Sequence, residues 1–374
     1  MISMPSSKNS VMNTSIIMHN IVITGGAGFV GSSLAFWLKK KFPDIGITCF
    51  DNLHRRGSEL NIPRLLEAGI SFIHGDIRMK SDLEMLPPFD LLIECSAEPS
   101  VLAGITSSPS YLLETNMVGT LNCLEVIRQN NAGLIFLSTS RVYPIQTINS
   151  VLYTEESTRF SPLDPISVTG FSSFGISEDF PISGARSLYG ATKLCSELFI
   201  EEYAAGFGIR SIINRCGMIS GPWQMGKVDQ GVVMHWVMSH IQGLELSYIG
   251  YGGEGKQVRD VLHITDLCRL IEMQILQPDL FVNRSYNVGG GPDNSVSLQE
   301  LTRICQTVTD NQILIRSIPD TRPNDLIWYV TDNRRITSLC GWKPEITVQQ
   351  TVTDIASWIM DTNVHLIRAL AEHV

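Results

Sequence analysis

The chain has 374 residues, 44% of them hydrophobic and 17% charged, which is enough apolar sequence to bury a large core and excludes global disorder. The formal net charge is −9 and the longest basic run is three lysines, so a nucleic-acid-binding face is not expected. No apolar stretch approaches the length of a membrane span, and the eight cysteines, none of them in a CxxC pair, favour a reduced, cytoplasmic protein.

The N-terminal half alternates short β-rich runs with helical stretches. Residues 1–18 are polar and lack the apolar core of a signal peptide, so we expect them to form a flexible leader. The predicted strands cover residues 21–24, 47–50, 71–74, 91–95, 134–138 and 211–214, and the predicted helices cover residues 29–41, 111–129 and 189–203. This alternation predicts an α/β fold, a Rossmann-type doubly wound parallel sheet, over residues 19–220.

The alternation breaks at two places. Residues 144–184 are rich in Ser, Pro, Phe and Gly without clear periodicity, which indicates either a functional flap or a disordered insertion. After residue 221, short strands separate helices that are predicted near residues 231–243, 264–277, 297–309 and 347–361. We interpret residues 221–374 as a smaller mixed α/β lobe that binds the substrate and exchanges some chain with the first domain.

A glycine-rich turn directly follows the first predicted strand and opens the first predicted helix. Its glycines, Gly25, Gly28 and Gly31, have GxxGxxG spacing. In such a turn the first glycine permits the tight bend, the second lets the backbone approach a pyrophosphate at the helix N-terminus, and the third lets helix and strand pack closely. Since the motif stands in the strand–turn–helix context that it requires, it predicts dinucleotide binding.

The second predicted strand leads into a carboxylate, Asp51, which lies 20 residues after Gly31. A carboxylate at this position accepts hydrogen bonds from the hydroxyls of the adenine ribose and repels a 2′-phosphate, which favours NAD. The neighbouring Arg55 and Arg56 are of the type that accommodates that phosphate, so NADP stays open as an alternative.

A second constellation lies at the start of a later predicted helix, where Tyr189 and Lys193 form a YxxxK motif. Residues four apart share a helix face, so the ammonium lies near the phenol. A nearby cation lowers the pKa of a tyrosine and makes it usable as a general base. Upstream, Ser138 and Thr139 end the fifth predicted strand, at the sheet edge where open α/β sheets bind ligands. A hydroxyl at that edge can bond to a reacting alcohol or ketone.

The glycine motif, Asp51, the Ser-Thr strand end and the YxxxK motif together resemble those of the extended short-chain dehydrogenases/reductases, the NAD-dependent nucleotide-sugar epimerases and dehydratases. The resemblance covers essentially residues 19–358. The segments most similar to the CDP-paratose 2-epimerase (CDP-tyvelose epimerase) subgroup are residues 50–57, 74–78, 96–101, 229–231 and 255–263. The resemblance implies NAD as cofactor, a CDP- or UDP-linked sugar as substrate, and a homodimer or homotetramer formed through helices 111–129 and 189–203.

The resemblance also assigns roles residue by residue. Thr139, Tyr189 and Lys193 match the catalytic Ser/Thr, the base and the lysine on the nicotinamide ribose. It implies that the cofactor is bound by Gly25, Gly28, Phe29, Val30, Gly31, Asp51, Asn52, Arg55, Asp76, Ile77, Ser96, Ala97, Asn116, Ser138, Tyr189, Lys193 and Cys216. It implies that the substrate is bound by Glu98, Gln230, Gln257, Arg259 and Arg322, of which the two arginines hold the nucleotide diphosphate. No metal site is expected, because the histidines and cysteines form no cluster with metal-ligand spacing.

The sequence departs from the family's pattern at two positions. The usual His-Leu-Ala-Ala after the fourth strand is Glu94-Cys95-Ser96-Ala97 here, so we expect different local contacts to the cofactor. Ser140-Arg141 stands where the sugar 4,6-dehydratases carry acidic residues, and elimination of water needs an acid and a base at that place. The dehydratase interpretation therefore loses its chemistry.

These features predict an NAD-dependent epimerase of a nucleotide-activated hexose or deoxyhexose, and they favour inversion at C2 of a CDP-linked sugar through a transient keto-sugar. A UDP-hexose 4-epimerase, which shares every cofactor residue, is the nearest alternative. A reductase or dehydratase of the same fold is the second alternative, and a catalytically silent dinucleotide-binding scaffold is the third. The intact Thr/Tyr/Lys set argues against the scaffold, and neither nucleic acid nor a membrane is an expected partner.

Overall fold

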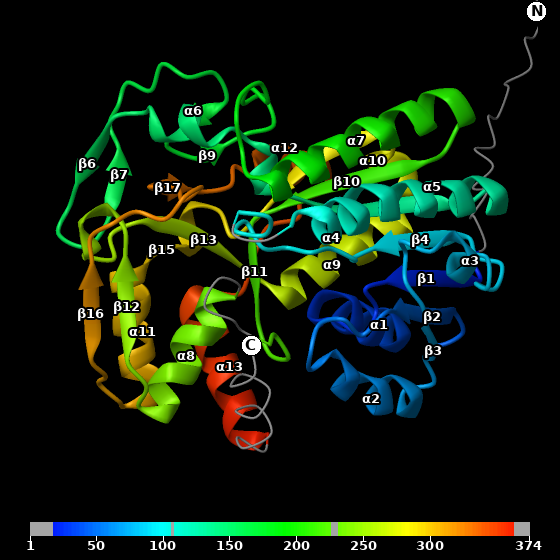
Figure 1. The fold of residues 1–374 in the computed structure, drawn as a ribbon, viewed down its shortest axis with the longest axis horizontal. Coiled ribbons are helices and arrows are strands. Elements are labelled where there is room, and N and C mark those ends of the chain that lie inside the picture. The colour runs from blue at the N-terminus through cyan, green and yellow to red at the C-terminus, as the bar shows by residue number, and fades with distance from the viewer. Residues whose placement is uncertain (1–17, 106–107, 226–230, 363–374) are drawn as a thin grey trace, which may run out of the picture.

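The first lobe is built on a parallel β-sheet. The structure, a computed structural model, describes residues 18–105, 108–225 and 231–362. Seven parallel strands lie in the order β14–β10–β5–β4–β1–β2–β3 (Figure 1). Their bounds are β1 (Asn20–Thr24), β2 (Gly46–Asp51), β3 (Ser71–His74), β4 (Leu91–Glu94), β5 (Gly133–Thr139), β10 (Ser211–Cys216) and β14 (Arg284–Val288). The order reverses between β1 and β4, and such a switch point is where open α/β sheets bind ligands.

Helices cover both faces of this sheet, because strands such as β4 are buried at every position and cannot face water on either side. One face is covered by α1 (Phe29–Lys41), α2 (Asn61–Glu67) and α9 (Ile264–Leu276). The other is covered by α5 (Gly119–Asn130) and α7 (Leu188–Phe207). The helix predicted over residues 111–129 is continuous from α4 (Ser110–Leu113) through a π-helical turn (Glu114–Val118) into α5. The predicted doubly wound sheet is confirmed.

The second lobe has its own sheets and core. Its strands are β11 (Met218–Ser220), β13 (Val258–His263), β15 (Ser295–Ser297) and β17 (Trp328–Tyr329) in one sheet, and β12 (Leu246–Ile249) with β16 (Ile315–Ile318) in another. The helices α8 (Val232–Gln242), α11 (Leu298–Thr309) and α13 (Val348–Asp361) pack around one apolar cluster (Figure 1). The chain then crosses between the lobes, because β14 follows β13 in sequence but lies at the edge of the first sheet.

Residues 144–184 form short elements that pack on the second lobe. They contain α6 (Ile145–Asn149), the hairpin of β6 (Tyr153–Glu155) and β7 (Phe160–Pro162), and the hairpin of β8 (Phe171–Ser172) and β9 (Gly175–Ile176). Phe171 stacks on Trp328 with ring centroids 5.1 Å apart. An apolar cluster with β17 therefore holds this segment against the second lobe.

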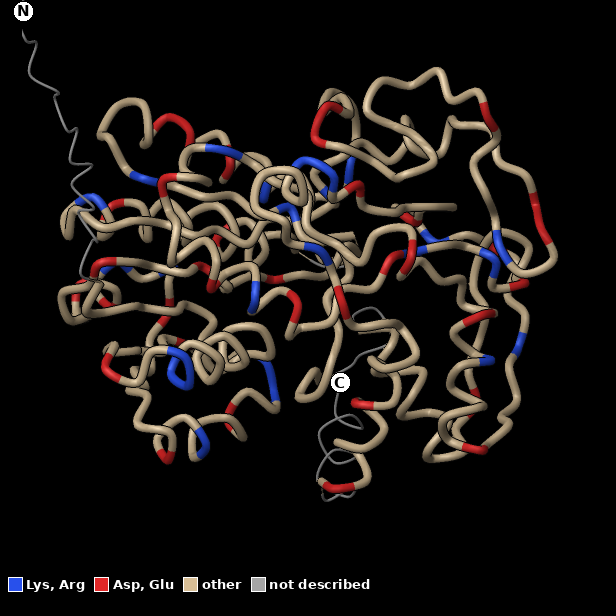
Figure 2. The backbone as a smooth tube through the Cα atoms, turned by 180° about the vertical axis from the view of Figure 1, so that it is seen from behind, with Lys and Arg blue, Asp and Glu red and all other residues tan. Residues whose placement is uncertain are grey.

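The remaining elements are one turn or two of helix: η1 (Ser58–Leu60), α3 (Lys80–Leu83), η3 (Ser140–Val142), η4 (Tyr251–Gly253), α10 (Pro278–Phe281), η5 (Pro292–Asn294) and α12 (Arg334–Cys340). Among the described helices, none is long and apolar enough to cross a membrane. In the described chain, Lys and Arg are interspersed with Asp and Glu over both lobes (Figure 2).

Candidate active site

Two adjoining cavities open at the carboxyl ends of the sheet strands. One, of about 700 Å³, runs over the glycine-rich turn, and we call it the glycine-turn cavity. The other, of about 590 Å³, is lined by residues of both lobes, and we call it the inter-lobe cavity. Pro99 and Met218 belong to the walls of both. The two cavities therefore share part of their walls.

The glycine-rich turn forms a cradle that side chains would fill. Gly25 has a φ of +64°, and a Cβ added there would lie 2.8 Å from the backbone nitrogen of Ser96. A Cβ on Gly31 would lie 2.2 Å from the carbonyl oxygen of Gly25. Gly28 caps α1 without a side-chain hydrogen bond. The first N–H groups of α1 are therefore left for an anion, as a pyrophosphate requires.

The carboxylate of Asp51 is held beside this cradle. It accepts hydrogen bonds from the backbone N–H of Ala27 at 3.1 Å and of Leu53 at 2.8 Å. Burial raises the pKa of Asp51, and these hydrogen bonds partly offset that rise. Two backbone donors still leave lone pairs on the carboxylate for the hydroxyls of a ribose.

Other residues predicted to bind the cofactor also line the glycine-turn cavity: Phe29, Val30, Asn52, Arg55, Ile77, Ser96 and Ala97. Arg55 donates to the carbonyl of Met225 at 2.6 Å, across the mouth of the cavity. Glu98, which the sequence assigned to the substrate, lines this cavity and not the inter-lobe cavity. Gln230 lies outside the described residues.

Five predicted cofactor residues lie in a layer beneath the two cavities and line neither of them: Asp76, Asn116, Ser138, Lys193 and Cys216. The amide of Asn116 bonds to the backbone of Glu98 and to Thr192 Oγ1, so it ties the loop after β4 to α7. The hydroxyl of Ser138 donates to the buried carboxylate of Glu197. Burial raises the pKa of Asp76, but hydrogen bonds from Arg78 and Asn52 outweigh it and lower that pKa to about 2.

Thr139 and Tyr189 lie together on the wall of the inter-lobe cavity. Thr139 ends β5, and its Oγ1 accepts from the backbone N–H of Arg141 at 3.2 Å. Tyr189 lies in the first turn of α7, which begins here because Ser187 caps it by accepting from the N–H of Gly190. Burial raises the pKa of Tyr189 to about 12, while a hydrogen bond with Thr139 and the cation of Arg141 act in the opposite direction.

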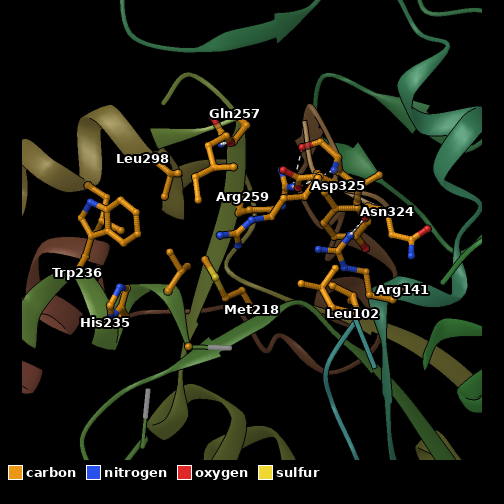
Figure 3. A pocket seen from close by; sticks show the side chains of 18 of the residues that line it. Leu102, Arg141, Met218, His235, Trp236, Gln257, Arg259, Leu298, Asn324 and Asp325 are labelled. Carbon is orange, nitrogen blue, oxygen red and sulfur yellow. Dashed lines mark hydrogen bonds and ion pairs between the residues drawn. The ribbon is translucent and has the colours of Figure 1, made fainter. Parts of the chain in front are cut away.

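Arginines gather on the same cavity. Arg259, Arg322 and Arg141 all line it, and Figure 3 shows Arg141 and Arg259 on its wall. Arg259 is paired with Asp325 at 2.8 Å, whereas the guanidinium of Arg141 donates to the carbonyl of Asn324 at 3.3 Å. Burial, together with the neighbouring cation of Arg259, lowers the pKa of Arg141 to about 10. Two half-buried guanidinium groups, of which one is paired with a carboxylate, favour an anionic ligand.

The opposite end of the inter-lobe cavity is apolar. Trp236, His235 and Leu298 lie there, across the cavity from Arg141 (Figure 3). Gln257 donates to the carbonyl of Ile249 at 3.0 Å, and its Oε1 has no donor among the described residues. An amide acceptor beside flat apolar side chains is suited to a heterocyclic base. The sequence gives no signal for Trp236, because its spacing in α8 is that of a core residue.

Comparison with known proteins places this geometry in context. Residues 21–289 match the model of the NAD dependent epimerase/dehydratase family. The chain is 31% identical to CDP-paratose 2-epimerase of Salmonella typhi over 346 residues, which is 90% of this chain and 98% of that protein. It is 26% identical to dTDP-glucose 4,6-dehydratase of Salmonella typhimurium over 91% of this chain and 92% of that one. The structure of Thermus thermophilus UDP-glucose 4-epimerase with NAD shares the fold, with a TM-score of 0.73 and 23% identity over 92% of this chain and all of that one.

Proposed function

The chain belongs to the NAD-dependent epimerase/dehydratase family, and from this premise we propose that it epimerises a nucleotide-activated sugar, with the C2 epimers CDP-paratose and CDP-tyvelose as the favoured pair. The observation that carries the proposal is the wall of the inter-lobe cavity, where Thr139 and Tyr189 are followed by Arg141 at the place of the dehydratase acids. The 31% identity to a CDP-paratose 2-epimerase supports the choice of sugar.

NAD is the cofactor, and the residues of the glycine-turn cavity fit it. The cradle of Gly25, Gly28 and Gly31 would hold the pyrophosphate, and Asp51 would accept from the adenine ribose. When bound, NAD would supply a reversible hydride acceptor for a carbon of the sugar. Pro99 and Met218, which line both cavities, would lie between the cofactor and the sugar.

In this mechanism Tyr189 takes the proton of the sugar hydroxyl and later gives it back. Thr139, at hydrogen-bonding distance of the phenol, holds the oxygen of the transient ketone. Since burial raises the pKa of Tyr189 to about 12, proton transfer near neutral pH requires cations close to the phenol. Arg141 supplies one, and Lys193, one turn further along α7, would be the second. Inversion requires the keto-sugar to present its other face, and Arg259 and Arg322 would hold the diphosphate while the sugar turns.

Asp51→Ala is expected to weaken NAD binding roughly 10- to 100-fold, because a charge-assisted hydrogen bond contributes about 1.5–3 kcal/mol. Sugar-nucleotide affinity should stay near the wild-type value, since Asp51 does not line the inter-lobe cavity. Titration calorimetry with each ligand measures both quantities. The matched control is Asp44→Ala, which removes the same charge from an exposed position before β2. An unchanged NAD affinity in Asp51→Ala contradicts the ribose role.

A substrate panel tests the proposed function. The purified protein is incubated with CDP-, UDP- and dTDP-linked hexoses and deoxyhexoses, and the products are separated and identified by NMR. We expect interconversion of C2 epimers of a CDP-sugar without net consumption of NAD(P)H. Inversion at C4 of a UDP-hexose supports the UDP-hexose 4-epimerase instead. Release of water or consumption of reduced cofactor contradicts an epimerase.

We also propose that the protein forms a homodimer or homotetramer through the helical face of α5 and α7. The support is apolar surface on α7, where the side chains of Leu198 and Phe207 are 51% and 60% exposed. Sedimentation velocity distinguishes these assemblies from a monomer.

A further inference from the structure

Glu94 is a carboxylic acid in an apolar layer, below the site described above. It ends β4, and its side chain is fully buried among Phe50, Phe136, Cys123 and Leu124, between the sheet and the helices α5 and α7. Its Oε1 accepts a hydrogen bond of 2.5 Å from Thr120 Oγ1. Its Oε2 has no hydrogen-bond donor among the described residues. A buried carboxylate with one oxygen unsatisfied costs stability unless a charge compensates it.

The register of the sheet shows which charge that is. Glu94 is paired with Phe136 on β5 and with Thr24 on β1, so these three side chains project from the same face in one row. The ammonium of Lys193, which enters this layer from α7, lies over the Phe136 ring at 4.2 Å from its centroid. The neighbouring strands of a sheet are about 4.8 Å apart. The ammonium and the carboxylate therefore both neighbour Phe136 in this apolar layer, without forming a direct ion pair.

Each group partly offsets the effect of burial on the pKa of the other. Burial raises the pKa of Glu94, and Lys193 is the strongest opposing influence. Burial lowers the pKa of Lys193, and Glu94 is the strongest opposing influence there as well. The other titratable groups facing the pair are the thiols of Cys95, Cys123 and Cys216 and the carboxylate of Glu197. Burial raises the pKa of all three thiols, so they are neutral, and Glu197 is already paired with Arg215 at 2.7 Å.

We propose that Glu94 is the buried counter-charge of Lys193, a positioning residue that keeps the lysine protonated beneath the cofactor and the Tyr189 phenol. The consequence for catalysis rests on the proposed function, whereas the charge couple itself does not. Without a negative charge in this layer, Lys193 loses its proton at lower pH and the phenolate of Tyr189 loses a stabilising cation.

Thermal unfolding of the purified protein tests the charge couple without substrate. At pH 8, Glu94→Gln and Lys193→Met should each lower Tm by several degrees, because each leaves one buried charge uncompensated. The decrease in Tm of the double variant should be clearly smaller than the sum of the two single decreases, since the double variant contains neither charge. Cys123→Ala is the matched control in the same layer, and its decrease in Tm should add to that of Lys193→Met. If the decreases in Tm of Glu94→Gln and Lys193→Met are additive, the two charges do not interact and the proposal is wrong.

The pH dependence tests the positioning role. In Glu94→Gln, the alkaline limb of the kcat profile should move to lower pH by about one unit, because the lysine then deprotonates earlier. NADH affinity, measured by fluorescence, should begin to change with pH at a value that is lower by the same amount. Cys123→Ala should leave both unchanged. An unmoved limb and an unmoved onset of the change in NADH affinity in a folded Glu94→Gln variant overturn the role. If no sugar nucleotide turns over, the proposed function fails, and the unfolding cycle and the NADH titration still decide this inference.

Discussion

Tyr189→Phe is expected to lower kcat roughly 10²- to 10⁴-fold, the contribution of a positioned general base. The phenol lies on the wall of the inter-lobe cavity and bonds to Thr139, and its oxygen is the only part of the side chain that phenylalanine lacks. Since Tyr189 does not line the glycine-turn cavity, the variant should still bind NAD with near wild-type affinity. Steady-state turnover together with the NAD content of the purified protein measures the two effects separately.

Tyr203→Phe is the control for the loss of a phenol oxygen from the same helix. Tyr203 lies four turns further along α7, and its hydroxyl donates to Glu125 at 2.6 Å, away from both cavities. We expect this variant to keep wild-type turnover. Wild-type turnover in Tyr189→Phe contradicts the role of the phenol as base.

Gly190→Ala should reduce kcat about 10²-fold, although no atom of the new methyl group reaches the substrate. A Cβ at this position would lie 2.0 Å from the carbonyl oxygen of Arg141 and 2.8 Å from its carbonyl carbon. Either α7 or the turn after β5 must therefore shift. Tyr189 precedes the substitution by one residue, and Thr139 precedes Arg141 by two. A displacement of about 1 Å between reacting groups costs on the order of 10²-fold in rate.

Gly206→Ala in the same helix is the matched control. A Cβ there meets no atom within 4 Å, and alanine in place of glycine stabilises a helix interior by about 1 kcal/mol. This variant should turn over like the wild type and unfold at a slightly higher temperature. Both variants are compared by turnover, bound NAD and thermal unfolding. Equal turnover in the two, with both folded, shows that the close approach of α7 to the turn after β5 does not matter for catalysis.

The first lobe could be predicted from the sequence because its signals are local. Strands buried on both faces are continuous apolar runs, and the glycines of the turn have a spacing that few other structures share. The strands and helices predicted for this lobe lie within a few residues of their expected places, whereas α2, α3 and β14 were not predicted. The second lobe was harder to read, because periodicity does not tell which sheet a strand joins. β14 follows the second-lobe strand β13 yet lies in the first sheet.

Residues 144–184 escaped prediction for a related reason. Their apolar side chains pack on residues far away in sequence, as Phe171 does on Trp328, so no local period marks them. Short hairpins such as β8–β9 form where tertiary contacts hold them, which propensity alone does not indicate.

The candidate site divides in the same way. Gly28, Asp51 and Thr139 were proposed as ligand-binding residues from their places in the glycine-rich turn and at strand ends, and they line the two cavities. Whether a polar residue faces the cavity or the layer beneath it depends on helix packing, and Asn116 and Ser138 belong to that layer. In the sequence, Arg141 stood out only because it replaces the acidic residues of the dehydratases. The structure places it on the wall of the inter-lobe cavity.

The central claim is that the sugar passes through a transient ketone with hydride returned to the same carbon. The most direct measurement is turnover of a CDP-sugar by the purified protein in deuterated water, with the products analysed by NMR and mass spectrometry and the NAD content of the protein determined. If the hydride returns to the carbon from which it came, we expect epimers in equilibrium, unchanged NAD and no solvent deuterium on any sugar carbon. Deuterium on a sugar carbon would contradict it, because such exchange requires enolisation or elimination.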